Sequence, residues 1–453
     1  MTRFDRRSIL KAGAVATGLA AAARFGGSAL AQTPGASPAA SPASDLPTSG
    51  FDTSSLTVSK PVEIEYWQYQ LDTKVDLVNK LIPEFEAANP NIKIKHVNYP
   101  YDDFRNQVAA GVQAGAGPDV LNLYYGWIPA YVQQQFLTAF PTDIFPTEQI
   151  EKEFYPTVAT GKIQGSYYAL PIAVRTLALF YNIDILDAAG VKPPTTWEEL
   201  VDAAKATVKK NGNKFETVGF TWDIGGQGHN WWRESLIRQN GGVPISDDNK
   251  TLDWTSDEAI EAFNYVTAFL TDYDVTQNAF ETDGPTAFGA GKAALHVDGS
   301  YRVGSLASGS PTLNYGVVPL PGHKSQASFA SYWANSITRN AADGDKLAAS
   351  AKWIDFLSSE SVQKRWTPIV GELPARVSLA DDPDLAANPK LKPFIDSLPY
   401  SRATFMVNEA DLRQFVMDAF DNVTLNGVDP KSAIQEAQDK VQAELDDYWK
   451  TFG

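Results

Sequence analysis

Alternation of apolar and polar residues along the chain predicts strands, and apolar residues every three or four positions predict helices between them. Residues 62–67 and 92–97 alternate in this way, and residues 73–88 between them place their apolar side chains on one helical face. Pro83 lies inside that helix and is expected to kink it. The resulting β-α-β order is typical of an open sheet flanked by helices.

The extended run of residues 167–181 is rich in Tyr, Leu, Ile, Val and Phe, and within it residues 170–180 predict a long buried strand. We expect this strand to leave one lobe and enter another, which makes a hinge and implies a cleft. After it, Thr195 and Glu198 are predicted to form a capping box that opens a helix at Trp197. The other predicted elements are strands at 120–124, 219–222, 295–297 and 329–337, and helices at 104–114, 197–210, 257–270, 346–358, 410–423 and 431–449.

The composition supports a two-domain protein, because 453 residues with 43% hydrophobic and 11% aromatic content can bury a substantial core. Cysteine is absent, so disulfides, thiolate metal sites and thiol nucleophiles are excluded. A formal net charge of −16 argues against a nucleic-acid partner, whose phosphates require clustered Lys and Arg. No apolar run after residue 31 is long enough to span a bilayer.

The first 31 residues look like a leader rather than part of the fold. Residues 5–11, Asp-Arg-Arg-Ser-Ile-Leu-Lys, resemble a twin-arginine export signal, and Ala29-Leu30-Ala31 fits a cleavage site. The alternative is an uncleaved amphipathic or disordered tail. Residues 32–57 are rich in Ala, Ser and Pro and are predicted to be a disordered linker. We therefore expect an exported protein, in the periplasm or at the extracellular face of the cytoplasmic membrane.

Several motifs occur in a fixed order along the chain. They are Gly-x-Gly-Pro-Asp-Val at 115–120, Leu-Pro at 170–171, Tyr-Asn-x-Asp-x-Leu at 181–186, Pro-Pro-x-Thr-Trp-Glu-Glu-Leu at 193–200, and Phe-x-x-Gly-Lys-Ala-Ala at 288–294. As an ordered set they resemble the extracellular solute-binding proteins of ABC importers, specifically the sugar-binding family that includes the maltose-binding proteins. The resemblance covers residues 60–450. Many members of that family are lipoproteins, but this chain has no lipobox cysteine to acylate.

The resemblance implies an α/β, two-lobed periplasmic-binding-protein fold of type II, in which each lobe is a mixed sheet flanked by helices and hinge strands join the lobes. It implies a monomeric, non-enzymatic receptor without cofactor or metal, which binds a sugar between the lobes and delivers it to ABC permease subunits by hinge closure. The implied lobes are residues 58–173 with 335–385, and residues 174–334 with 386–453.

Aromatic side chains suit a sugar because a flat ring stacks on the C–H face of a pyranose, while polar groups bind the hydroxyls at its edge. Ligands of open α/β sheets lie at the carboxyl ends of the strands, and aromatic residues gather there in this sequence. Gln70 is one candidate. The predicted binding residues are Trp67, Gln68, Tyr124, Trp127, Arg175, Trp222, Trp231, Asp298, Tyr301, Trp333 and Arg376. Core packing or surface ion pairs would explain several of them equally well.

Two alternatives remain open from the sequence. Arg175, Arg376 and Arg402 could bind an anionic cargo such as a glycerol phosphate or a uronate. A glycoside hydrolase would need two carboxylates about 5–10 Å apart across the cleft, and no local motif marks such a pair. The four histidines show no metal-ligand spacing.

Overall fold

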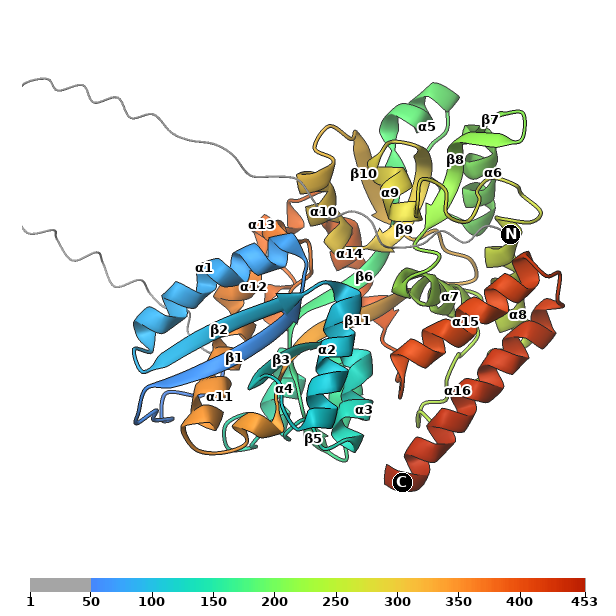
Figure 1. Ribbon diagram of the computed structural model, residues 1–453. Coiled ribbons are helices and arrows are strands. Elements are labelled where there is room, and N and C mark those ends of the chain that lie inside the picture. Colours follow the sequence, from blue (N-terminus) through green and yellow to red (C-terminus); the bar gives the residue numbers. More distant parts are fainter. Residues whose placement is uncertain (1–49, 453) are drawn as a thin grey trace, which may run out of the picture. The chain divides into compact units, whose positions relative to one another are not determined.

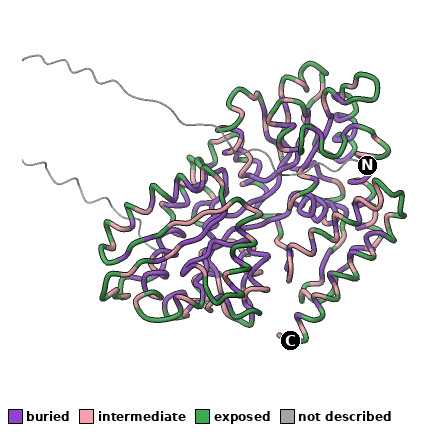
Figure 2. The backbone as a smooth tube through the Cα atoms, in the orientation of Figure 1, coloured by how far each residue is buried: buried purple, intermediate pink, exposed green. Residues whose placement is uncertain are grey.

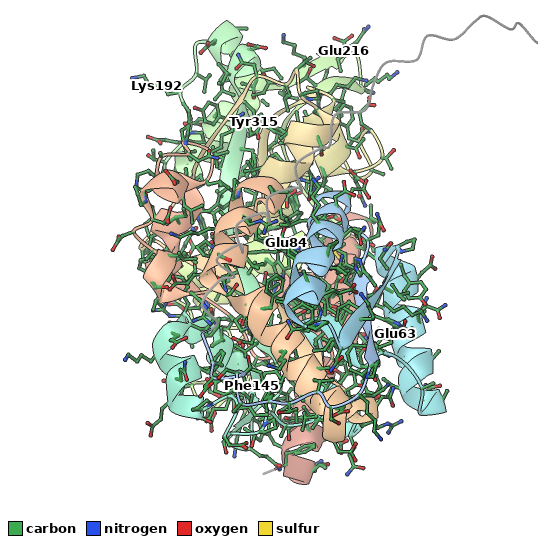
Figure 3. All side chains as sticks on the ribbon, turned by 90° about the vertical axis from the view of Figure 1, so that its left-hand side faces the viewer. Glu63, Glu84, Phe145, Lys192, Glu216 and Tyr315 are labelled. Carbon is green, nitrogen blue, oxygen red and sulfur yellow. The ribbon has the colours of Figure 1, made fainter. Side chains whose placement is uncertain are left out.

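The computed structural model describes residues 50–452, and the predicted leader lies outside them, as does most of the predicted linker. The last residues of that linker are ordered, so the prediction of disorder up to residue 57 is wrong for residues 50–57. Phe51 is buried against Phe145, with ring centroids 5.1 Å apart, and Thr53 donates a 2.8 Å hydrogen bond to Asp355. One aromatic side chain in a stretch of biased composition is enough to fix the backbone around it. Figure 3 shows Phe145 in the first lobe, far from Tyr315 in the second lobe.

The first lobe begins with the predicted β-α-β unit (Figure 1). Strand β1 (Val62–Tyr69) pairs in parallel with β2 (Ile92–Tyr99) and with β3 (Val120–Tyr124). Helix α1 (Asp72–Ala88) runs through Pro83 without a break in its helical assignment. The other elements of this lobe are α2 (Tyr101–Ala114), α3 (Ile128–Gln133), α4 (Thr147–Glu153), β4 (Lys162–Ile163), β5 (Ser166–Tyr167), α11 (Gly344–Ser358) and α12 (Glu360–Val370).

Two strands carry one sheet across both lobes, as expected for hinge strands. The first half of β6 (Leu170–Asn182) pairs antiparallel with β11 (Ser328–Ile337), and its second half pairs with β9 (Ala293–Gly299) and β10 (Tyr315–Pro319). Strand β11 also pairs with β3. Within residues 50–452 the ten-stranded sheet therefore follows the order β2-β1-β3-β11-β6-β9-β8-β7, with β10 and β12 (Ser401–Arg402) beside this path. Figure 2 shows the two crossing strands, β6 and β11, buried along most of their length.

The second lobe surrounds β8 (Lys214–Trp222), which pairs in parallel with β9 and antiparallel with the short β7 (Lys209–Asn211). Its remaining elements are α5 (Ile183–Ala189), α6 (Trp197–Thr207), α7 (Gln227–Gln239), α8 (Asp257–Ala268), α9 (Gly284–Gly289), α10 (Tyr301–Gly309), α14 (Lys392–Ser397), α15 (Glu409–Thr424) and α16 (Pro430–Phe452). The short helix α13 (Pro383–Ala386) contacts both α12 and α14. The two C-terminal helices pack against each other beside α7 and α8 (Figure 1).

The start of α6 corrects the predicted capping box by one residue. Thr196, not Thr195, is the N-cap, and its side chain accepts a hydrogen bond from the Glu199 backbone N–H. The Glu199 carboxylate in turn accepts hydrogen bonds from the backbone and side chain of Thr195, both at 2.7 Å. The return contact of Glu199 thus goes to the residue before the N-cap, not to the N-cap itself as in a standard capping box, and because two threonines and two glutamates adjoin, the sequence left the register undetermined.

Candidate functional site

A cleft of about 240 Å³ lies where β6 and β11 pass between the lobes, and both lobes line it. The first lobe contributes the residues that follow β1 and the first residue of α2, which places the cleft at the carboxyl end of a parallel strand. The crossing strands contribute one residue each. The lining residues are Tyr69, Gln70, Leu71 and Tyr101 from the first lobe, Arg175 and Trp333 from the crossing strands, and Asp223, Gly226, Gln227, Trp231, Tyr301 and Arg413 from the second lobe.

Aromatic rings from both lobes border this cleft. Tyr69 and Trp333 pack with their centroids 4.1 Å apart, on the side of the first lobe. Opposite them, the Arg175 guanidinium lies 4.5 Å from the ring centre of Tyr301. Trp231, at the start of α7, stacks on Phe329 at 5.8 Å. A ligand in the cleft would therefore meet flat apolar surfaces on two sides.

Arg175 is held by a buried carboxylate. Its Nε donates a 2.7 Å hydrogen bond to Glu372, its Nη2 donates to the same carboxylate and to the hydroxyl of Tyr69, and Trp366 donates to Glu372 at 2.7 Å. Burial alone would raise the pKa of Glu372, but Arg175 and Lys74 together hold that pKa below its usual value. The charge of Arg175 is thus balanced inside the protein before any ligand arrives.

Lys74 lies fully buried behind the aromatic wall of the cleft. Its ammonium donates a 2.8 Å hydrogen bond to Asn122 and sits 4.6 Å from the ring centre of Tyr69 and 4.8 Å from that of Trp333. Burial lowers the pKa of Lys74 to about 7, and the neighbouring charge of Arg175 acts in the same direction. Lys74 belongs to no sequence motif, although it shares the buried face of α1 with Val78.

Three polar atoms of cleft-lining residues are buried and have no hydrogen-bond partner among residues 50–452. They are the hydroxyl of Tyr101, the Nε2 of Gln227 and the Nε1 of Trp333. Buried polar groups in native proteins are almost always hydrogen-bonded, and each exception calls for a water or a ligand. All three can donate, so they suit a ligand that is rich in hydroxyl oxygens.

Asp223 is the one carboxylate among the lining residues. It lies at the boundary between the cleft and a polar cavity of about 300 Å³, and it accepts a long 3.4 Å hydrogen bond from the Gly228 backbone N–H. Burial, together with the nearby charge of Asp298, raises the pKa of Asp223. No sequence motif marked this residue.

The structure brings five of the candidates considered from sequence to the cleft: Gln70, Arg175, Trp231, Tyr301 and Trp333. Two aromatic candidates lie close by. The Tyr124 hydroxyl accepts a 3.0 Å hydrogen bond from Trp231 Nε1, and it thereby links the two lobes. Trp127 lines a neighbouring cavity of about 390 Å³, and its Nε1 donates to Glu409 at 3.3 Å.

Two polar candidates make contacts within the protein instead. Asp298 accepts a 2.6 Å hydrogen bond from Arg302 and lies 3.1 Å from His296. Arg376 forms an ion pair with Glu153 in the first lobe, and its guanidinium lies 4.7 Å from the ring centre of Phe154. These ion pairs explain the charged side chains at positions 298 and 376 without a ligand.

Three further candidates do not line the cleft. Trp67 and Gln68 lie inside β1, and the cleft is lined instead by Tyr69, the last residue of that strand, and by Gln70, which follows it. Trp67 packs on Tyr99 at 5.4 Å, and the side chain of Gln68 is fully buried. Trp222 is also fully buried, because it packs inside the second lobe against Phe220 and Trp232, and it has no surface left for a ligand.

Two lobes joined by crossing strands, with a polar and aromatic cleft between them, define a solute-binding protein. The chain belongs to the bacterial extracellular solute-binding protein family, whose model matches residues 80–393.

Among the curated relatives, a maltotriose-binding protein of Pyrococcus abyssi is 24% identical over 73% of this chain and 70% of its own length. A galactooligosaccharide-binding protein of Bacillus subtilis is 24% identical over 86% of this chain and 91% of its own length. The structure of an ABC-transporter solute-binding protein from Thermotoga lettingae, bound with α-D-tagatose, superposes with a TM-score of 0.74 and 21% identity over 85% of this chain and all of that chain. Within residues 50–452, none of the helices combines the length and the hydropathy that crossing a membrane requires.

Proposed function

We propose that this protein is the extracytoplasmic receptor of an ABC importer, and that it binds a sugar or a short oligosaccharide between its lobes. The observation that carries the proposal is the cleft itself. Rings from both lobes offer stacking surfaces, and Tyr101, Gln227 and Trp333 offer unpaired hydrogen-bond donors at the same place. Apolar walls with a few oriented polar groups are typical of small-molecule sites. The relatives described above bind sugars, which supports the same class of cargo.

The site we propose is the set of cleft-lining residues, with Tyr124 and Trp127 in supporting positions. Arg175 would donate to a ligand hydroxyl while Glu372 keeps its charge balanced. This balance weighs against the anionic cargo, because a phosphate or uronate would need a cation that is free to pair with it. A glycoside hydrolase is also disfavoured. Hydrolysis needs two carboxylates, and in the described part of the chain Asp223 is the one carboxylate that lines the cleft.

We further propose that the ligand closes the hinge and that the closed form docks on the permease. A ligand that contacts both lobes favours the closed state by the difference between its affinities for the two states. Residues 58–173 with 335–385 would move against residues 174–334 with 386–453. The twin-arginine leader would direct export, and the protein would act as a monomer.

The test has two steps. Mass spectrometry of natively purified protein identifies any co-purified ligand, and isothermal titration calorimetry with mono- and oligosaccharides measures affinity. Small-angle X-ray scattering then compares the radius of gyration with and without the tightest ligand. We expect micromolar or tighter binding and a smaller radius. Absence of binding to every sugar would contradict the receptor function, and binding without compaction would contradict hinge closure.

A further inference from the structure

We infer that the cleft selects a sugar that carries a protonated amino group, and that this group is bound at Asp223. The inference rests on the proposed sugar-receptor function and narrows its substrate class. It follows from the charges on the two sides of the cleft.

On the side of the first lobe, the cation that faces the cleft is already neutralised. Arg175 is paired with Glu372, which is itself fully buried and receives a second hydrogen bond from Trp366. Lys74 lies behind the rings of Tyr69 and Trp333 rather than in the cleft. This side therefore offers an anionic ligand no unpaired cation within direct reach.

On the side of the second lobe, two more cations are paired. The Arg413 guanidinium lies 3.6 Å from the carboxylate of Glu409, one turn earlier on α15. Arg302 donates a 2.6 Å hydrogen bond to Asp298, whose second neighbour is the ring of His296. Arg175, Arg413 and Arg302 thus each have a carboxylate of their own.

Asp223 is the exception to this balance. Among residues 50–452 no cation lies within ion-pair distance of its carboxylate, and its one hydrogen bond is the long one from Gly228. The carboxylate of Asp298 repels its charge, and Arg302 offsets this repulsion only in part. A Cβ atom on Gly226 would collide with the Asp223 carboxylate, so glycine at that position leaves room for the carboxylate between the loop and the cleft.

A protonated amine would interact more strongly with this carboxylate than a hydroxyl would. An ammonium group brings a compensating charge and three N–H donors, and charge-assisted hydrogen bonds are about twice as strong as neutral ones. A sugar hydroxyl brings one donor and no charge. A uronate would place a second anion beside Asp223 and would be rejected.

The experiment compares amino, neutral and uronic forms of the same sugars by isothermal titration calorimetry at pH 7, in the gluco and galacto series, as mono- and disaccharides. For the wild-type protein we expect the amino form to bind about tenfold or more tightly than its neutral parent, which is the size expected for one additional charged hydrogen bond. The ratio of the two dissociation constants should fall toward one in Asp223→Asn. It should not change in Asp247→Asn, a matched control at an exposed aspartate on a second-lobe loop.

The preference should also shrink as the pH is lowered through the pKa of Asp223, because a neutral carboxyl no longer attracts the ammonium group. Circular dichroism confirms that both variants are folded. If sugars bind but the neutral or uronic form is tightest, or if Asp223→Asn keeps the amino preference, this inference is overturned while the receptor function stands. If no sugar of any form binds, the receptor function itself fails.

Discussion

Lys74 allows a quantitative test of the buried charges behind the cleft. Its pKa is about 7 in the folded protein, against an ordinary value of 10.5. Between these two values the unfolded chain binds more protons than the folded one, so raising the pH favours folding. The destabilisation caused by Lys74 is therefore greatest below pH 7 and disappears as the pH rises toward 10.5.

The size of the effect follows from the shift. Each unit of pKa corresponds to about 1.4 kcal/mol, and the linkage relation gives a gain of about 2 kcal/mol in the free energy of unfolding between pH 7 and pH 9. Lys74→Met removes the titrating group and keeps most of the volume. The difference between wild type and Lys74→Met should thus change by about 2 kcal/mol over this range, with the wild type gaining stability relative to the variant as the pH rises.

Urea unfolding followed by tryptophan fluorescence at several pH values measures this difference, because the other titrating groups largely cancel between the two proteins. Lys80→Met is the matched control, since Lys80 is exposed on the same helix. The control should differ from wild type by the same amount at every pH. A difference between wild type and Lys74→Met that does not depend on pH would refute the buried-charge reasoning, and so would a loss of wild-type stability on raising the pH.

Three further predictions concern single contacts. Glu372→Gln should destabilise the protein by about 3–5 kcal/mol in urea unfolding, because it leaves Arg175 buried without a counter-charge. The double variant Arg175→Met with Glu372→Met should cost much less than the two single changes added together, and additive effects would argue against a coupled pair. Phe51→Ala should cost about 3–5 kcal/mol, and a cost below about 0.5 kcal/mol would show that the segment before β1 does not pack on the first lobe. Trp333→Ala should weaken binding of the tightest sugar at least about tenfold in calorimetry, and unchanged affinity would remove this ring from the site.

The sequence predicted the scaffold well because its strongest signals are long and periodic. A strand of thirteen residues such as β6 can be buried along its whole length only between other strands, and its apolar run made that clear. The C-terminal helices were also predicted closely, since α15 and α16 each repeat one apolar face over several turns. The start of α7 is harder to predict, because the helix begins at Gln227 directly after two glycines, which are more typical of a loop.

The site was predicted only in part, and the reason is geometric. Trp67 and Tyr69 share one face of β1, and only Tyr69, at the end of the strand, lines the cleft, so the site depends on where the strand ends. Trp222 shows the same ambiguity, because the strand that carries it is covered by other rings of the second lobe. Asp223 and Lys74 stand outside any motif, and only their three-dimensional surroundings distinguish them from ordinary surface charges.

The anchoring of Phe51 has a practical consequence for measuring lobe movement. Phe51 is fixed to the first lobe, whereas α16 packs on α8 and α15 in the second. A donor fluorophore attached just ahead of Phe51 and an acceptor attached just after Phe452 would therefore travel with opposite lobes. Energy transfer between them depends on their separation and would change on the proposed hinge closure, so a genetically encoded sensor for the cargo could be built without altering any residue of the cleft.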